Sequence, residues 1–205
     1  MVTLVKKKDG FLFSELVDSN AISKAKREIL HIVRCPEEFS EMLTMELKDI
    51  YGLTGLTPYY SISFCQGDGL CLTGKIRLDE LFNNPLFSKI AFAGLYHKSV
   101  KMIHDYINDI NFTHKCAQYY YPSSINISLD VIYGDDFAKK HWAVVYKIED
   151  NITKWYLEFC KSWEKNGYDY FYEIDDEEMS DVCELNEWFF DQYGNLISSD
   201  FEITD

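Results

Sequence analysis

The sequence lacks any hydrophobic run approaching the roughly 20 residues that a membrane-spanning helix requires. It also lacks a charged and then apolar leader that ends in a small-residue cleavage site. We therefore expect a cytoplasmic protein with no membrane partner. Its 6 cysteines are scattered without a C-x-x-C pair, so free thiols are expected rather than disulfides.

The residue spacings of common metal sites are absent as well. None of the 5 histidines forms an H-E-x-x-H motif or pairs with a cysteine at zinc-finger spacing. The acidic run at residues 175–178 lacks the central glycine and the spaced acids of an EF-hand loop. His97 and His104 could share one helical face, but we interpret them as ordinary helical histidines. No metal, cofactor or catalytic residue is therefore expected.

Basic residues are scarce in the C-terminal quarter of the chain. Residues 149–205 contain 3 lysines, no arginine and 17 acidic residues, whereas residues 1–148 contain 17 residues of each sign. The net charge of −14 therefore belongs to the C-terminal quarter. Folding alone does not require this, because like charges repel and slightly destabilise a compact state. Such a segment should repel nucleic acid and attract basic protein surfaces, unless it is only a solubilising surface.

Hydrophobic residues make up 47% of the chain, which excludes wholesale disorder. Their spacing predicts helices and strands. Apolar residues at steps of three and four predict most of the helices. The 4 prolines are all interpreted as boundaries of elements: Pro36, Pro58, Pro85 and Pro122. The expected helices cover residues 20–34, 36 to about 52, 85–109 and 137–163, and a last one begins at 175–178.

Alternating apolar residues predict the strands. The clearest hairpin joins residues 60–64 to 70–78 through Gln66-Gly67-Asp68-Gly69, with both glycines at positive φ and Asp68 exposed. Further strands are expected at residues 2–5, at 111–117 pairing with 125–133, and in a closing hairpin at 189–197. The sum is an α+β fold: a small antiparallel sheet covered on one face by helices, with an acidic C-terminal helical segment. We expect one domain over residues 1–205, charge-neutral over 1–148 and acidic over 149–205.

The turn after Cys65 also permits an enzymatic interpretation, with Cys65 as nucleophile or Asp68 as base or metal ligand. A nucleophilic cysteine needs an electropositive neighbour, and no histidine lies near Cys65 in the sequence. A phosphate-binding loop would place its glycines before a helix, whereas these lie between two strands. We favour a structural turn whose Gln66, Gly67, Asp68 and Gly69 form a recognition loop. A small hydrolase or nucleotide-processing enzyme is the alternative.

Tyrosines are concentrated at residues 119–121 and at Tyr168, Tyr170 and Tyr172. Aromatic platforms that stack on bases combine aromatic residues with Lys or Arg, and the second cluster lies among acids instead. This disfavours direct nucleic-acid binding. Packing is the default expectation for these side chains, and a protein interface is the alternative.

Residues 60–69, Tyr-Ser-Ile-Ser-Phe-Cys-Gln-Gly-Asp-Gly, resemble a segment of small phage and prophage accessory proteins that share a Y-S-x-x-x-[SC]-Q-G-D-G core. The layout of those proteins is also similar, with N-terminal helices, a tyrosine-rich strand, an acidic C-terminal helix and a final aromatic turn. Residues 190–194 approximate that last turn, and residues 70–74 depart from the family pattern. The resemblance implies an accessory gene of a mobile element, and it points to no particular reaction.

In that setting, the acidic segment suggests a counter-defence inhibitor, anti-CRISPR-like or antirestriction-like, acting in the host cytoplasm. It would mimic nucleic acid, whose duplex form carries one charge per about 1.7 Å of axis. The expected partner is a host defence protein with a basic nucleic-acid-binding groove; an antitoxin or other protein-binding module is an alternative. Tyr168, Tyr170 and Tyr172 would serve as anchors. The acidic binding residues would be Asp175, Asp176, Glu177, Glu178, Asp181, Glu184 and Glu187.

Overall fold

The computed structural model describes residues 3–6, 10–104, 106–115, 120–131, 135–197 and 201–204. The chain forms two compact units. The sheet unit comprises Glu37–Gly167, and the terminal unit combines Met1–Pro36 with Tyr168–Asp205. The charge boundary after residue 148 lies inside one long helix, α6 (Asp135–Tyr172). The expected single domain over residues 1–205 stays a prediction.

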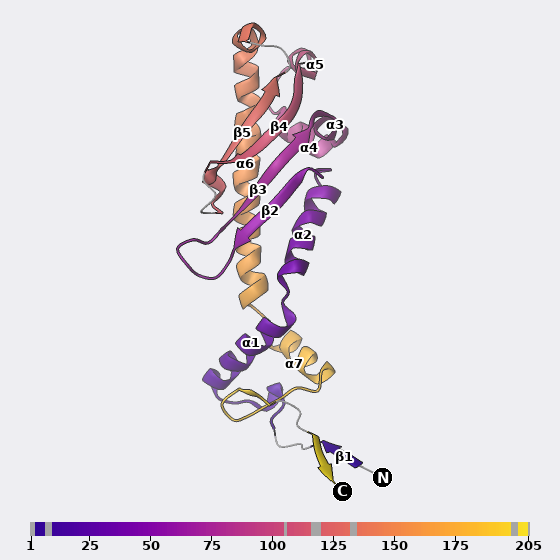
Figure 1. Cartoon of the computed structure of the whole chain (residues 1–205), viewed down its shortest axis with the longest axis vertical. Helices are drawn as coiled ribbons and strands as arrows, with labels where there is room; N and C mark the ends of the chain where they lie inside the picture. The colour runs from indigo at the N-terminus through magenta and orange to yellow at the C-terminus, as the bar shows by residue number, and fades with distance from the viewer. Residues whose placement is uncertain are drawn as a thin grey trace. The chain divides into compact units, whose positions relative to one another are not determined.

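The sheet unit contains a four-stranded antiparallel sheet in the order β2-β3-β4-β5 (Figure 1). Its strands are β2 (Leu56–Ser61), β3 (Gly69–Arg77), β4 (Ile107–His114) and β5 (Ile125–Val131). The predicted hairpin and the predicted pairing of the last two strands are confirmed. Pro58 was expected to precede the first strand, but it lies inside β2 opposite Leu72. An edge strand tolerates proline because one row of its N–H groups has no partner strand.

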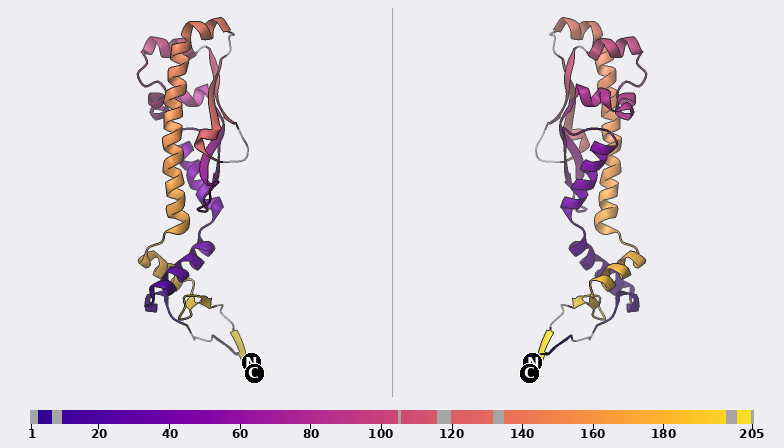
Figure 2. Two further views of the ribbon diagram at one scale, coloured as in Figure 1. Left: turned by 90° about the vertical axis from the view of Figure 1, so that its left-hand side faces the viewer. Right: turned by 90° about the vertical axis from the view of Figure 1, so that its right-hand side faces the viewer.

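Helices of the sheet unit lie on one side of the sheet, as predicted: α2, α4 and α6 are all on the same side in both views of Figure 2. The bounds are α2 (Pro36–Asp49), α3 (Leu78–Asn83), α4 (Pro85–Ala91) and α5 (His97–His104). The single helix predicted over residues 85–109 is wrong. Gly94 at φ +75° lies in the turn that follows α4, and the chain turns again into β4 at Ile107.

Aromatic rings join α6 to its neighbours in the sheet unit. Trp155 packs against Phe87 of α4 with ring centroids 4.9 Å apart, and Trp163 packs against Phe39 of α2 at 5.4 Å. A third contact joins Tyr156 to Phe112 of β4 at 5.6 Å. Full burial of each large apolar side chain contributes roughly 1.5–3 kcal/mol, so this row supplies much of the core.

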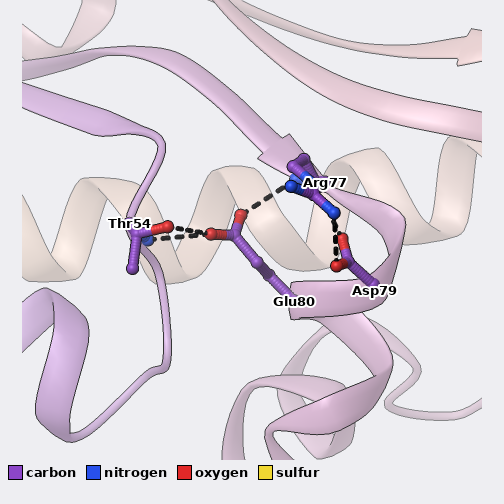
Figure 3. Close-up of polar contacts among 4 residues, drawn as sticks. All are labelled: Thr54, Arg77, Asp79 and Glu80. Atoms are coloured by element: carbon purple, nitrogen blue, oxygen red, sulfur yellow. Dashed lines mark hydrogen bonds and ion pairs between the residues drawn. The ribbon is translucent and has the colours of Figure 1, made fainter.

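Glu80 ties the connection between α2 and β2 to the start of α3 (Figure 3). Its carboxylate accepts hydrogen bonds from Thr54 N at 3.0 Å, from Thr54 Oγ1 and from Arg77 N at 3.0 Å. Arg77 in turn donates from Nε and Nη2 to Asp79, at 2.9 and 2.6 Å. The Glu80 carboxylate accepts from backbone N–H groups, and the Asp79 carboxylate accepts from the nearby Arg77 side chain. We therefore interpret this cluster as structural.

The terminal unit is built on two helices, α1 (Ser19–Val33) and α7 (Asp176–Leu185). Both were predicted from the sequence, and so was the closing hairpin of β6 (Phe189–Phe190) and β7 (Leu196–Ile197). The first strand, β1 (Thr3–Lys6), pairs with β8 (Phe201–Thr204). A short 3-10 helix, η1, covers Phe13–Glu15. The core combines residues from α1, α7 and the hairpin: Ala25, Ile29, Met179, Cys183 and Phe190.

A capping aspartate marks the start of α1, and a glycine with positive φ follows the end of α2. Asp18 Oδ1 accepts hydrogen bonds from Asn20 N and Ala21 N, at 2.8 and 2.9 Å, which caps α1. After α2, Gly52 adopts φ +66° and its N–H reaches the Lys48 carbonyl at 2.9 Å. This is the glycine stop that the sequence predicts. Within the described ranges, no helix is both long enough and apolar enough to cross a membrane.

Candidate protein-binding surface

The predicted acidic residues lie in and next to α7, and they differ in their contacts. Asp175 is the N-cap of α7, because its Oδ1 accepts a hydrogen bond from Glu178 N at 2.7 Å. Met179 and Cys183, one turn apart, face the core of the terminal unit. These two contacts fix which side of α7 is turned toward solvent.

Two acids in the first turn of α7 pair with cations in α1 and at its C-terminal end. Lys26 Nζ lies 2.6 Å from Asp176 Oδ1, and Arg34 Nη2 lies 2.6 Å from Glu178 Oε1. Lys26 also donates to the Ile174 carbonyl at 2.8 Å. Residues 168–205 contain no lysine or arginine, so every cation that pairs with this segment must come from elsewhere in the chain. Neutralising the whole run 175–178 would therefore remove contacts of the fold as well as charge.

Three acids remain on the outer side of α7. Glu177, Asp181 and Glu184 are exposed and follow one another at steps of four and three, which places them on one helix face. Among the residues that the structure describes, no cation pairs with any of them. We call these three residues the outward row. Glu187 is exposed too, but it follows the helix at φ 54° and is not part of the row.

The outward row places three carboxylates along about 10 Å of helix axis, with a mean axial spacing of about 5 Å. One strand of duplex DNA carries a charge per about 3.4 Å, so the charge density of the row is lower than that of one strand and well below that of a duplex. Leu185, 85% exposed, lies at the end of the same helix and adds apolar surface beside the row. The arrangement suits contact with a basic protein surface.

The predicted tyrosine anchors lie in the last turn of α6, because this helix continues to Tyr172 rather than ending at residue 163. Tyr170 packs under the Arg34 guanidinium, which lies 5.1 Å from its ring centroid, and its hydroxyl donates to the Cys35 carbonyl at 3.4 Å. Tyr168 and Tyr172 lie with ring centroids 6.2 Å apart. Tyr170 therefore has a packing role, and Tyr172 is the exposed member of the cluster.

The predicted recognition loop has a different organisation from the expected one. Asp68 was expected to be exposed, but it is only 8% exposed. Its carboxylate accepts hydrogen bonds from Ser63 N at 2.7 Å, Cys65 N at 2.9 Å and Ser61 Oγ at 3.0 Å. An ionised carboxylate that gathers several donors organises the loop around itself. Asp68 is thus a structural centre and not a free recognition group.

The glycines of this loop also differ from the prediction. Neither Gly67 nor Gly69 adopts a positive φ, and Phe64 does so instead at 56°. Gly69 is needed for another reason: a Cβ there would lie 2.9 Å from the Tyr120 carbonyl oxygen. A Cβ on Gly67 would meet nothing within 4 Å. Gln66 is exposed, and position 67 has room for a side chain.

The same contacts account for part of the residue pattern at positions 60–69. Cys65 Sγ donates to Asp68 Oδ1 at 3.1 Å, and a serine hydroxyl at this position could donate in the same way. Tyr60 and Ser40 hydroxyls lie 3.0 Å apart, which joins β2 to α2. The motif therefore has a structural explanation that needs no reaction.

Neither cysteine near the motif has the setting of a nucleophile. A thiolate at Cys65 would face the negative carboxylate of Asp68, and no histidine in the described ranges bonds to it. The thiol that does approach a histidine is Cys71, whose Sγ lies 3.8 Å from His114 Nε2. Cys71 is fully buried, and burial raises the pKa of its thiol to about 11. Within the described residues, no three His, Cys, Asp or Glu side chains gather to hold a metal.

The prediction of free thiols is confirmed for the five cysteines that the structure describes. Cys65 is exposed and Cys35 half-buried, whereas Cys71, Cys160 and Cys183 are buried. Cys116 lies outside the described residues.

The roles of the acids predict separate effects on stability. Replacing Asp175 by alanine should destabilise the terminal unit by about 1 kcal/mol, because the cap of α7 is lost. Replacing Glu177 by glutamine should change stability by less than about 0.5 kcal/mol, since it removes only repulsion within the outward row. Urea unfolding of the two single variants measures both values. An equal loss of stability in the two variants would contradict the different roles of Asp175 as a cap and Glu177 as a member of the outward row.

Sequence reasoning found the acids but missed their partners, Lys26 and Arg34, which lie far away in the chain. The available signal was that α1 carries several cations while the last 38 residues carry none. No protein-family model, curated protein or solved structure matches this chain, so the assignment of function depends on the residues described above.

Proposed function

We propose that this chain is a counter-defence inhibitor of a phage or prophage that binds a basic, nucleic-acid-handling groove of a host defence protein. The outward row of Glu177, Asp181 and Glu184 is the binding surface. The observation that carries this proposal is that the row is exposed and unpaired, while the neighbouring Asp176 and Glu178 are neutralised by α1.

The charges of the outward row favour binding to a basic partner and do not favour the helix itself. Three like charges on one helix face disfavour the helix by a few tenths of a kcal/mol for each close pair, so they do not serve stability. Facing a groove lined with lysine and arginine, the same charges accelerate association and discriminate against acidic partners. Leu185 beside the row supplies apolar area that a partner can bury. The resemblance of residues 60–69 to phage accessory proteins supports the setting.

A DNA-cleavage protection assay tests the proposal. Purified restriction endonucleases and CRISPR nucleases are incubated with the chain before DNA is added, and the cleavage rate is measured. We expect the wild-type chain to slow at least one of these nucleases. The variant Glu177→Gln/Asp181→Asn/Glu184→Gln should lose at least tenfold in inhibitory potency.

A matched control separates this surface from net charge. The variant Glu41→Gln/Asp49→Asn/Glu158→Gln removes the same three charges from exposed positions of the sheet unit. It should inhibit as the wild type does. Equal loss in both variants, or no inhibition of any nuclease by the wild type, would contradict the proposal.

A further inference from the structure

A cationic hollow lies on α1 in the terminal unit, in spite of the acidic character of the chain. It has a volume of about 400 Å³. Its polar side chains come from successive turns of α1: Ser23, Lys26, Arg27 and His31. Phe171 and Tyr172, from the end of α6, supply aromatic walls. The hollow therefore combines positive charge with aromatic surface.

Arg27 and Lys26 differ in their partners. Lys26 is engaged by Asp176 and by the Ile174 carbonyl, but no carboxylate in the described part of the chain pairs with Arg27. A guanidinium presents N–H donors in a fork that matches two oxygens of a phosphate. An exposed arginine without an acidic partner, in a unit rich in acids, is thus available for an external anion.

A second hollow adjoins the first and extends it along α1. It has a volume of about 720 Å³ and shares Ser23 and Arg27 with the first hollow. Lys24 and Tyr193 also line it, and Tyr193 is 66% exposed. Asp18 also lines it, but this carboxylate is occupied as the cap of α1. Arg27 therefore lines both hollows, whose linings include a second cation and aromatic residues.

We propose that this surface binds a nucleoside monophosphate, with the phosphate on Arg27 and the base against Phe171 and Tyr172. Planar rings stack favourably on aromatic side chains, and a volume of about 400 Å³ lies in the range of small-molecule sites. A long nucleic acid is disfavoured, because residues 168–205 carry 13 acids and no lysine or arginine. This inference is independent of the inhibitory function proposed above.

Isothermal titration of the full chain at low salt tests the inference, with AMP, adenosine and inorganic phosphate as separate probes. AMP should bind saturably, and adenosine and phosphate should each bind at least tenfold more weakly. Arg27→Ala should weaken AMP binding at least tenfold, and Tyr172→Leu should weaken it without changing the weak binding of phosphate. The control Lys89→Ala, which removes an exposed cation of the sheet unit, should bind AMP as the wild type does.

Three results would overturn the inference: no saturable binding of AMP, equal affinity in Arg27→Ala and Lys89→Ala, or phosphate binding as tight as AMP binding. Tighter binding of a short single-stranded oligonucleotide than of AMP would also overturn it, because that result would assign the surface to nucleic acid. Thermal unfolding followed by circular dichroism verifies that each variant retains its fold. Arg27 is exposed and its side chain makes no hydrogen bond or ion pair within the described residues, so its replacement should leave the melting temperature unchanged.

Discussion

Replacing Asp68 by alanine is expected to destabilise the sheet unit by about 3 kcal/mol. The carboxylate is buried, and its removal leaves Ser63 N and Cys65 N without their acceptor in the loop between β2 and β3. Hydrogen bonds to a charged group contribute about 1.5–3 kcal/mol each, and water can replace only part of this at the two part-buried donors. The expected value is far above that of a typical surface substitution.

Urea unfolding of the full chain measures this effect, with Asp79→Ala as the matched control. Asp79 is an exposed aspartate whose partner, Arg77, is also exposed, so its loss should cost less than about 1 kcal/mol. Asp68→Asn should fall between the two, since the amide keeps one acceptor oxygen. Similar stability for Asp68→Ala and Asp79→Ala would mean that the loop is not organised by this carboxylate.

Raising the pH from 8 to 11 is expected to reduce the free energy of unfolding of the sheet unit by several kcal/mol. Burial raises the pKa of the Cys71 thiol from the ordinary value of 9.0 to about 11, and it also raises the pKa values of Cys160 and Tyr156. Above pH 9 the unfolded chain loses these protons while the folded chain keeps them, so alkali favours unfolding. The shift at Cys71 alone corresponds to about 2.7 kcal/mol.

The pH window of this effect is its diagnostic feature. The contribution of Cys71 is fully present below pH 9.0 and is lost as the pH rises through about 11. Urea unfolding at several pH values should show a falling stability in this range, and Cys71→Ala should show a shallower fall. A wild-type stability that stays constant from pH 8 to 11 would contradict the buried, neutral state of these groups.

Local signals in the sequence were sufficient for several elements of the fold. The helix of residues 20–34, the glycine stop after α2 and the start of α7 depend on periodicity and capping within a few residues. The helix predicted over 85–109 failed because the apolar residues of two short helices and of β4 fall at compatible spacings. The turn at Gly94 separates the two helices, and a turn at Tyr106 precedes β4.

Long-range contacts explain what the sequence could not predict at the candidate site. Arg34 and Glu178 are 144 residues apart, so no local pattern shows that they pair. Asp68 looked exposed because polar residues and glycines surround it, yet those same polar groups are its donors. The cationic hollow arises because α1 and the end of α6 meet in the terminal unit.

The salt dependence of association tests the central claim that the outward row binds a basic partner. The probe is the nuclease that the wild-type chain inhibits most strongly, and the association rate is measured from about 50 to 500 mM salt, where the screening length falls from above to below 10 Å. The wild type and the Glu41→Gln/Asp49→Asn/Glu158→Gln control should show the same steep decrease. Glu177→Gln/Asp181→Asn/Glu184→Gln should associate more slowly and lose most of the slope. Equal rates and slopes in all three proteins would contradict the account.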